Sequence, residues 1–361
     1  MNAAANPVLG IARAELRKAL APRRLWWVAL LALAPCALYG LLYVQVHLRF
    51  EQRQSWAATA AHHLTPGDFQ GVHFNGMSEA QVVARLGPPA FRNEFHARTR
   101  GSDDHVRRIT VVRLGYSDGH ALHEIVLRDG VVTGVANNHP PTLANLSNSF
   151  AGVFEFFFLR LAVFFGCLGI FMNLFRAEML NKSLHYYFLA PVPRARVMWG
   201  KFIAGLVVAM GVFCSSLALQ SWTVARIAGL AGENLRFLPH TGAYLGVTAL
   251  GCLGYGAVFL ACGLLFRNPI VPAIVLLLWE GMVPFLPAIP QKLSIIYYLI
   301  QLSPYPLASS PGTTPLLALF VAPPVPLNPT LAVAGLVGVT ALVLWASTRL
   351  VRRLEIDYTA D

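Results

Sequence analysis

Three charged side chains lie inside long apolar stretches of this sequence, where a charge is costly and a functional role is the default expectation. They are Glu155, Arg160 and Glu280. On an α-helix, Arg160 would stand about 7.5 Å from Glu155 along the axis and about 140° around it, so we do not expect a direct pair. For Arg160 and Glu280, lining of a substrate path and bonding between helices are both open. Glu155 stands near the end of its stretch, within reach of lipid headgroups.

Histidine and cysteine do not show the spacing of a metal site. Only His62-His63 and His120-x-x-His123 are close in sequence, and His120 and His123 point to opposite faces of a strand. Because no cysteine accompanies them, we expect solvated histidines. The cysteines all fall inside apolar runs and are expected to be small buried residues: Cys36, Cys167, Cys214, Cys252 and Cys262.

Motifs of enzymatic chemistry do not stand out either. The phosphate-binding pattern G-x-x-x-x-G-K-[ST] is missing, because the one Gly-Lys pair, Gly200-Lys201, is followed by Phe202. No nucleophile triad or metalloprotease helix is apparent. We therefore predict that this chain is not an enzyme and binds no cofactor or metal itself.

The composition indicates a membrane protein. Hydrophobic residues make up 56% of the 361 residues and charged residues 12%, against roughly 45–50% and 25% in soluble proteins. The formal net charge of +11 would suit a nucleic-acid partner. However, the charges flank apolar runs and do not form a basic face, so nucleic-acid binding is not expected.

Six apolar runs approach or exceed the roughly 20 residues that a membrane-spanning helix needs. They are 26–47, 151–175, 202–224, 243–265, 270–286 and 330–348, of which the fifth is short. The first is too long for the apolar region of a cleaved signal peptide. Fourteen Lys and Arg residues fall in the segments on one side and three in the short loops on the other, which places both termini inside. The prediction is a polytopic all-α membrane protein with six transmembrane helices, N-in and C-in.

Residues 48–150 predict a small α+β extracytoplasmic domain. It is inserted between a first part, 1–47, that holds the first transmembrane helix and a last part, 151–361, that holds the other five. In GMSEAQVVARLGPP, residues 76–89, Ser78 and Gln81 form a capping box, and Gly87 ends the helix. The β-branched runs 106–116, 120–130 and 131–137 predict a three-stranded meander. Its turns, Asp118-Gly119 and Asp129-Gly130, suit the type I′ geometry.

The helix and the strand ending at an Asp-Gly turn together resemble the BamE-like (SmpA/OmlA) lipoprotein domain over residues 70–137. The resemblance implies a fold and a tendency to bind other envelope proteins, with a purely structural spacer as the alternative. Those lipoproteins carry a lipidated cysteine ahead of the domain, and this chain has no cysteine outside its apolar runs.

A polar segment at 176–190 follows helical periodicity. Its apolar residues fall at i, i+4, i+7 and i+8: Leu180, Leu184, Tyr187 and Phe188. The opposite side carries Glu178, Lys182 and His185. Pro191 and Pro193 end the pattern. We predict an amphipathic helix on the cytoplasmic side, which by periodicity alone could be an interfacial linker.

The surrounding pattern resembles the coupling-helix region of type-2 ABC transporter permeases. It reads Phe-Arg-x-Glu-Met, then Ser-Leu-x-Tyr-Tyr-x-Leu-x-Pro-Val, then Arg and Gly-Lys, and the matching residues are Glu178, Ser183, Leu184, Tyr186, Tyr187, Pro191, Val192, Arg194, Gly200 and Lys201. Ahead of the first span, Leu9, Ala12, Leu16 and Leu20 form a stripe like that of the family's amphipathic N-terminal helix. Short re-entrant or outer-surface helices at 287–329 also match the family.

This resemblance implies the permease subunit of an ATP-binding cassette exporter in a bacterial inner membrane. It implies a homodimer, or a heterodimer with a homologous permease, and a separate cytoplasmic ATPase that binds ATP and Mg. The residues it implies for ATPase coupling are Glu178, Lys182, Ser183, His185, Tyr186, Tyr187, Pro191 and Arg194.

Two other functions stay open. A membrane-anchored envelope scaffold would act through residues 48–150. An ion-coupled secondary transporter would use Arg160 and Glu280, but no inverted repeat is visible. No residue pattern selects a substrate.

Overall fold

The computed structural model describes residues 7–19, 22–59, 64–69, 74–100, 106–180, 193–232, 238–266, 270–304 and 327–353. The chain forms two compact units. The membrane unit comprises Met1–Tyr39, Ala144–Ala225 and Leu235–Asp361, and the second unit, called the α+β unit below, comprises Gly40–Leu143 with Arg226–Asn234.

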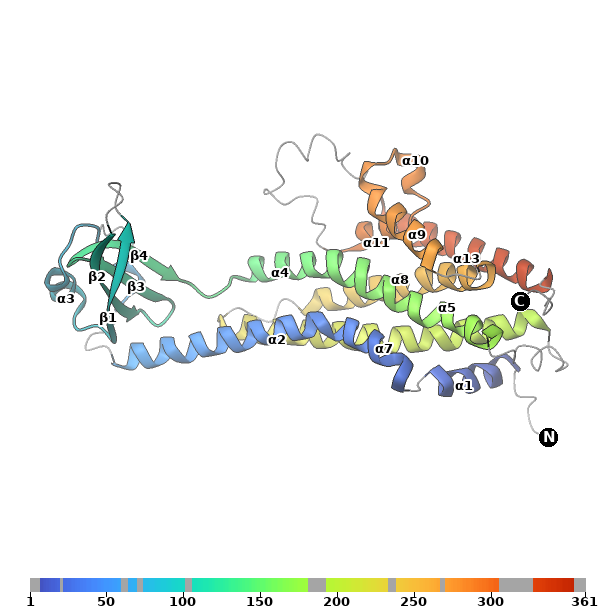
Figure 1. The fold of residues 1–361 in the computed structure, drawn as a ribbon, viewed down its shortest axis with the longest axis horizontal. Helices are drawn as coiled ribbons and strands as arrows, with labels where there is room; N and C mark the ends of the chain where they lie inside the picture. Colours follow the sequence, from blue (N-terminus) through green and yellow to red (C-terminus); the bar gives the residue numbers. More distant parts are fainter. Residues whose placement is uncertain are drawn as a thin grey trace. The chain divides into compact units, whose positions relative to one another are not determined.

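The membrane unit is built from helices. They are α1 (Pro7–Ala19), the first part of α2 (Pro22–Thr59), α4 (Leu143–Gly152), η2 (Val153–Val163), α5 (Phe164–Leu180), α7 (Arg194–Leu230), α8 (Leu238–Leu265), α9 (Ile270–Met282), η3 (Val283–Phe285), α10 (Ala288–Gln291), α11 (Ile295–Leu302) and α13 (Pro329–Arg353). Helix α8 packs against α5 and α13, and α11 packs against α8 and α13 (Figure 1).

Five helices in the described part of the chain are long and apolar enough to cross a membrane, which makes this a multi-pass membrane protein. They are Trp26–Thr59, Leu143–Met172, Arg194–Leu230, His240–Leu265 and Pro329–Arg352. The predicted run 270–286 instead gives α9, with 13 residues. At 1.5 Å per residue, this helix measures about 20 Å, less than the hydrocarbon core of about 30 Å. Pro284 ends the helix, because proline lacks the N–H that a further turn needs.

Small residues set the packing of α8, although not every glycine of the helix takes part. A Cβ on Gly256 would lie 2.6 Å from the Phe171 ring, and one on Gly254 would lie 3.1 Å from Ile295. No atom stands within 4 Å of such a Cβ at Gly242 or Gly246. The close contacts of α8 therefore concentrate on its later glycines.

The second apolar run departs from α-helical geometry where its charges lie. Residues Val153–Val163 form a π-helix between α4 and α5, and this segment contains both Glu155 and Arg160. A π-helix bonds residue i to i+5, so residues five apart lie closer around the axis than on an α-helix. The angle of 140° expected for Glu155 and Arg160 is therefore wrong for this segment. Glu155 is buried in the protein, and the expectation that it reaches toward lipid headgroups is not met.

The α+β unit holds a four-stranded antiparallel sheet in the order β1-β2-β3-β4. Its elements are the second part of α2, η1 (Pro66–Asp68), α3 (Glu79–Leu86), β1 (Phe91–Arg100), β2 (Val106–Ser117), β3 (Leu122–Arg128) and β4 (Val131–Asn138). The predicted helix is confirmed, with the reciprocal capping box of Ser78 and Gln81 and a left-handed Gly87 at φ 83°. The three predicted strands are present as well. Strand β1 was missed, because FRNEFHARTR lacks β-branched residues apart from one threonine.

The two Asp-Gly turns differ. Asp129 and Gly130 both have positive φ, 49° and 84°, as a type I′ turn requires. At Asp118-Gly119 only the glycine has positive φ, and Ser117 pairs with Leu122, which leaves a four-residue loop. The Asp118 carboxylate accepts the amide hydrogens of His120 and Ala121. The type I′ prediction is thus confirmed at Asp129-Gly130 and wrong at Asp118-Gly119, where a side chain organises a longer turn.

The hydrophobic core of this unit lies between α3 and one face of the sheet. It consists of Phe69, Phe74, Val82, Leu86, Val112, Leu114, Tyr116, Ile125, Leu127 and Val132. The α2 helix meets the sheet elsewhere, where the Trp56 ring stacks on Phe91 with centroids 5.6 Å apart. A Cβ on Gly115 would lie 2.5 Å from that indole, so the glycine makes room for the helix.

Candidate functional site

Most of the residues predicted for ATPase coupling lie outside the described part of the chain. Glu178 falls in the last turn of α5, and Arg194 is the first residue of α7. Lys182, Ser183, His185, Tyr186, Tyr187 and Pro191 belong to 181–192, which the structure does not describe. The two ends of this segment, α5 and α7, can therefore be examined directly.

Lys201 joins these two ends to the N-terminal helix. Its ammonium donates a hydrogen bond to the Leu174 carbonyl of α5 at 3.1 Å. The same Nζ lies 3.2 Å from Oε1 of Glu15 on α1, and the two side chains are 0% and 5% exposed. We call Glu15, Leu174, Gly200 and Lys201 the Lys201 junction. One buried cation thus connects α1, α5 and α7.

Gly200 lets α1 approach closely enough for this contact. A Cβ there would lie 2.8 Å from Cγ2 of Ile11 and 3.2 Å from the Val8 carbonyl oxygen. The side chain would therefore force the backbone of α1 away from α7, and the Glu15–Lys201 distance would increase. Gly200 and Lys201 act together, one by its small volume and the other by its charge.

Sequence reasoning found Lys201 but missed its partner. The predicted apolar stripe of α1 included Ala12 and Leu16, and Ala12 is indeed buried. Among the side chains of that helix that the structure describes, the other buried one is the acidic Glu15, three residues further on and on the same side. The signal was available, since Glu15 is the only acid in the basic stretch LGIARAELRKALAPRR.

Glu280 bonds one short helix to another. Its carboxylate accepts the Ser294 hydroxyl at 2.6 Å and the backbone amides of Ile295 and Ile296 at 3.1 and 3.0 Å. These donors form the start of α11, where amides lack partners within the helix. Of the two roles open for Glu280, the geometry supports bonding between helices.

Arg160 is different, although it lies near enough to Glu280 for electrostatic interaction. Its guanidinium carbon stands 5.6 Å from the Phe156 ring centroid. Among the residues that the structure describes, no hydrogen bond or ion pair of this guanidinium is found, and Nε is buried without a partner. For Arg160, the role of a helix-bonding residue has no support in the geometry.

A polar contact between α2 and α7 was not foreseen from the sequence. The Ser216 hydroxyl donates to the Ala32 carbonyl at 2.6 Å and accepts a hydrogen from the Gln220 amide at 3.0 Å. Cys36 Sγ lies 3.4 Å from the same hydroxyl oxygen. Hydrogen bonds of this kind hold transmembrane helices together, so we assign this group to packing of the first span.

In the α+β unit, the expectation of solvated histidines is wrong for His123. This side chain is 3% exposed and stacks on Phe69 with centroids 3.6 Å apart. Its ring nitrogens lie 2.9 Å from Asn137 Oδ1 and 3.2 Å from Asp118 Oδ2. The pattern HALHEIVLRDG could have indicated this, because His123 occupies an inward position that alternates with Glu124.

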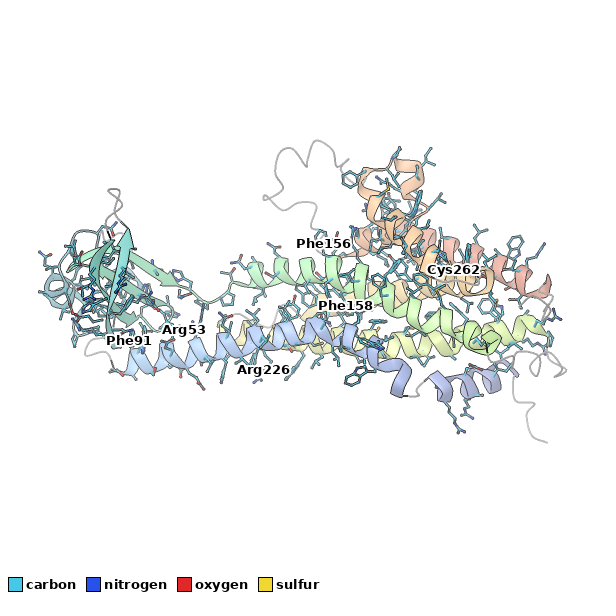
Figure 2. The ribbon with its side chains drawn as sticks, in the orientation of Figure 1. Arg53, Phe91, Phe156, Phe158, Arg226 and Cys262 are labelled. Atoms are coloured by element: carbon cyan, nitrogen blue, oxygen red, sulfur yellow. The ribbon has the colours of Figure 1, made fainter. Side chains whose placement is uncertain are left out.

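The Asp118 carboxylate is held in its ionised form. Burial alone would raise the pKa of Asp118, but hydrogen bonds from the Ala121 amide, the His123 ring and the His120 amide outweigh burial and lower that pKa. Arg53 of α2 donates to the His120 carbonyl at 2.9 Å. The network thus fastens the α2 helix to the loop that precedes β3; Figure 2 labels Arg53. Within the described ranges, no cluster of three or more His, Cys, Asp or Glu side chains could hold a metal ion.

Comparisons with known proteins gave no match. No family model, no curated protein and no solved structure matches the chain. The function of the chain is therefore inferred from its own residues and from the Lys201 junction.

Proposed function

We propose that this chain is the membrane-spanning permease subunit of an ABC exporter, driven by a separate ATPase. The observation that carries the proposal is the Lys201 junction, which connects α1 to the two helices that flank residues 181–192. If an ATPase displaces this segment, the displacement of α5 and α7 is transmitted to α1 through one buried ion pair. The sequence resemblance at 175–201 supports the same function.

The proposal includes a topology with both termini in the cytoplasm of a bacterial cell and the α+β unit outside. This topology requires six membrane crossings. The five long helices supply five of them, so α9 must supply the remaining short crossing. A helix of about 20 Å can do so where the bilayer thins or where other helices complete the path. The excess of Lys and Arg in the inner segments supports this arrangement.

Two copies, or one copy and a homologous permease, would enclose the transport path. ATP and Mg would bind to the ATPase subunits. Envelope proteins would be the partners of residues 48–150.

Capture of the ATPase tests the proposal. The full chain, purified in detergent after mild crosslinking, is expected to retain an ATPase, and Glu178→Ala or His185→Ala is expected to lose it. Arg352→Ala is the control, because this exposed charge belongs to the same proposed side but not to the coupling segment. A stable chain that never retains an ATPase contradicts the proposal.

The envelope scaffold is the second candidate, and the separate core of the α+β unit favours it. Removing residues 55–145 distinguishes the two functions. A permease without them is expected to keep ATPase capture, whereas a scaffold would lose every interaction.

A further inference from the structure

Arg160 is a membrane-embedded cation that the described part of the protein does not neutralise by direct contact. It lies in the π-helical segment of the second span, and its guanidinium carbon stands 5.6 Å from the centroid of the Phe156 ring. A cation over an aromatic face is stabilised only weakly. That stabilisation is small against the cost of a charge at membrane depth.

Glu280 is near enough to Arg160 for electrostatic interaction, but its carboxylate is already used. Glu280 accepts three hydrogen bonds from α11, and rotation toward Arg160 would leave the amides of Ile295 and Ile296 unsatisfied in a buried site. A buried amide that loses its hydrogen-bond acceptor keeps the full cost of its desolvation. Glu280 therefore lowers the electrostatic energy of Arg160 from a distance but does not occupy its donors.

The surface beside Arg160 is apolar and faces outward. Phe156 is 60% exposed, and Leu161 and Phe165 are each 37% exposed. Phe158, two residues from Phe156, is instead fully buried against Phe213. The side of the segment that carries Phe156 therefore faces outward, and the side that carries Phe158 faces the protein; Figure 2 labels both residues. A guanidinium bordered by such a surface is complementary to a molecule with an anionic group and an apolar body.

We propose that Arg160 binds the anionic headgroup, phosphate or carboxylate, of a lipid-like amphiphile whose apolar chain lies along Phe156, Leu161 and Phe165. The planar guanidinium offers paired donors that match two oxygens of such a group. Resting lipids keep their headgroups at the membrane surface, so an anion at this depth belongs to a molecule in transit. Its assignment as cargo rests on the proposed function, whereas binding itself does not.

Photocrosslinking tests the binding. The full chain is reconstituted in phosphatidylcholine vesicles that contain a trace of diazirine-labelled phosphatidylglycerol, without any ATPase. The peptide covering 153–165 is expected to be labelled, and Arg160→Gln is expected to reduce this labelling about tenfold, the loss that corresponds to about 1.4 kcal/mol. Arg160→Lys keeps the charge without the paired donors, and we expect an intermediate loss.

Two controls test whether the labelling depends on Arg160 in particular and whether the bound anion belongs to an amphiphile or is free phosphate. Arg349→Gln removes an arginine that also lies over an aromatic ring, 4.5 Å from Trp345, and is expected to leave labelling of 153–165 unchanged. Inorganic phosphate is expected not to compete; displacement by phosphate contradicts an amphiphile site. Equal labelling by diazirine-labelled phosphatidylcholine, insensitive to Arg160→Gln, would overturn the proposal. A chain that fails to capture an ATPase contradicts the proposed function but not the binding of an amphiphile at Arg160, so the failure of one proposal can be distinguished from the failure of the other.

Discussion

At Lys201, one buried ammonium contacts three helices, and removing it takes the cation away from the buried Glu15 carboxylate. We predict that Lys201→Met destabilises the chain by about 3–5 kcal/mol, because Glu15 stays buried and charged. The double variant Glu15→Leu/Lys201→Met is expected to recover most of the loss. Thermal unfolding in detergent measures both. Lys292→Met is the control, since this lysine is exposed; equal effects of the single and the double variant would contradict a paired role for Lys201.

Glu280 also acts at the scale of single hydrogen bonds. We predict that Ser294→Ala, which removes the 2.6 Å hydrogen bond to the carboxylate, destabilises the start of α11 by about 1.5–3 kcal/mol. Ser303→Ala is the matched control at the other end of the helix, because its buried hydroxyl has no partner among described residues. Hydrogen exchange at the amides of Ile295 and Ile296 reports the difference. Equal exchange in both variants would argue against the cap.

The Asp118 carboxyl gives the α+β unit a pH dependence. Its pKa is lower in the folded chain than the unfolded value of about 3.9. The stabilisation is therefore fully present above that pH and is lost as the pH falls through the folded pKa. We predict that Asp118→Asn destabilises the unit at neutral pH and abolishes this acid-dependent loss. Limited proteolysis of the full chain across a pH series tests it; an unchanged acid profile in the variant would show that other groups dominate.

At the scale of elements, the packing of α2 on the sheet depends on the absence of a side chain. We predict that Gly115→Ala destabilises the α+β unit by about 1–3 kcal/mol, because the new Cβ would lie 2.5 Å from the Trp56 indole. Gly134→Ala on β4 is the matched control, since no atom stands within 4 Å of a Cβ there. Protease resistance of residues 60–140 in the full chain distinguishes the variants. A harmless Gly115→Ala would mean that α2 shifts freely on the sheet.

At the scale of the whole molecule, the role of α9 decides the topology. If α9 crosses, the C-terminus lies on the same side as the start of α7; with only the five long helices crossing, it lies on the opposite side. Single cysteines at Thr133, Arg196 and Arg352, in a chain whose native cysteines are replaced, measure this with an impermeant maleimide. We predict external labelling at Thr133 alone. External labelling at Arg352 would establish five crossings.

Local signals were strong enough to predict several elements from the sequence. Long apolar runs must form helices in a membrane because no water is present to bond the backbone, and Ser78 with Gln81 bonds within one turn. Elements with weaker local signals were missed or misjudged. Strand β1 depends on pairing with β2 along its whole length, and η2 lies within an apolar run whose composition does not distinguish a π-helix from an α-helix.

By itself, the sequence determined the class of the protein, the places of its long apolar helices and the capped helix α3 of its α+β unit, because each follows from hydropathy or from bonds within a few residues. Only the tertiary structure decided the partners of its buried charges. Glu15 pairs with Lys201, which lies 186 residues further along the chain. Glu280 on α9 caps α11, which begins only after the short helices η3 and α10. Such pairs are chosen by desolvation, which acts only once helices have packed, and the same packing leaves Arg160 Nε buried without a hydrogen-bond partner among the described residues.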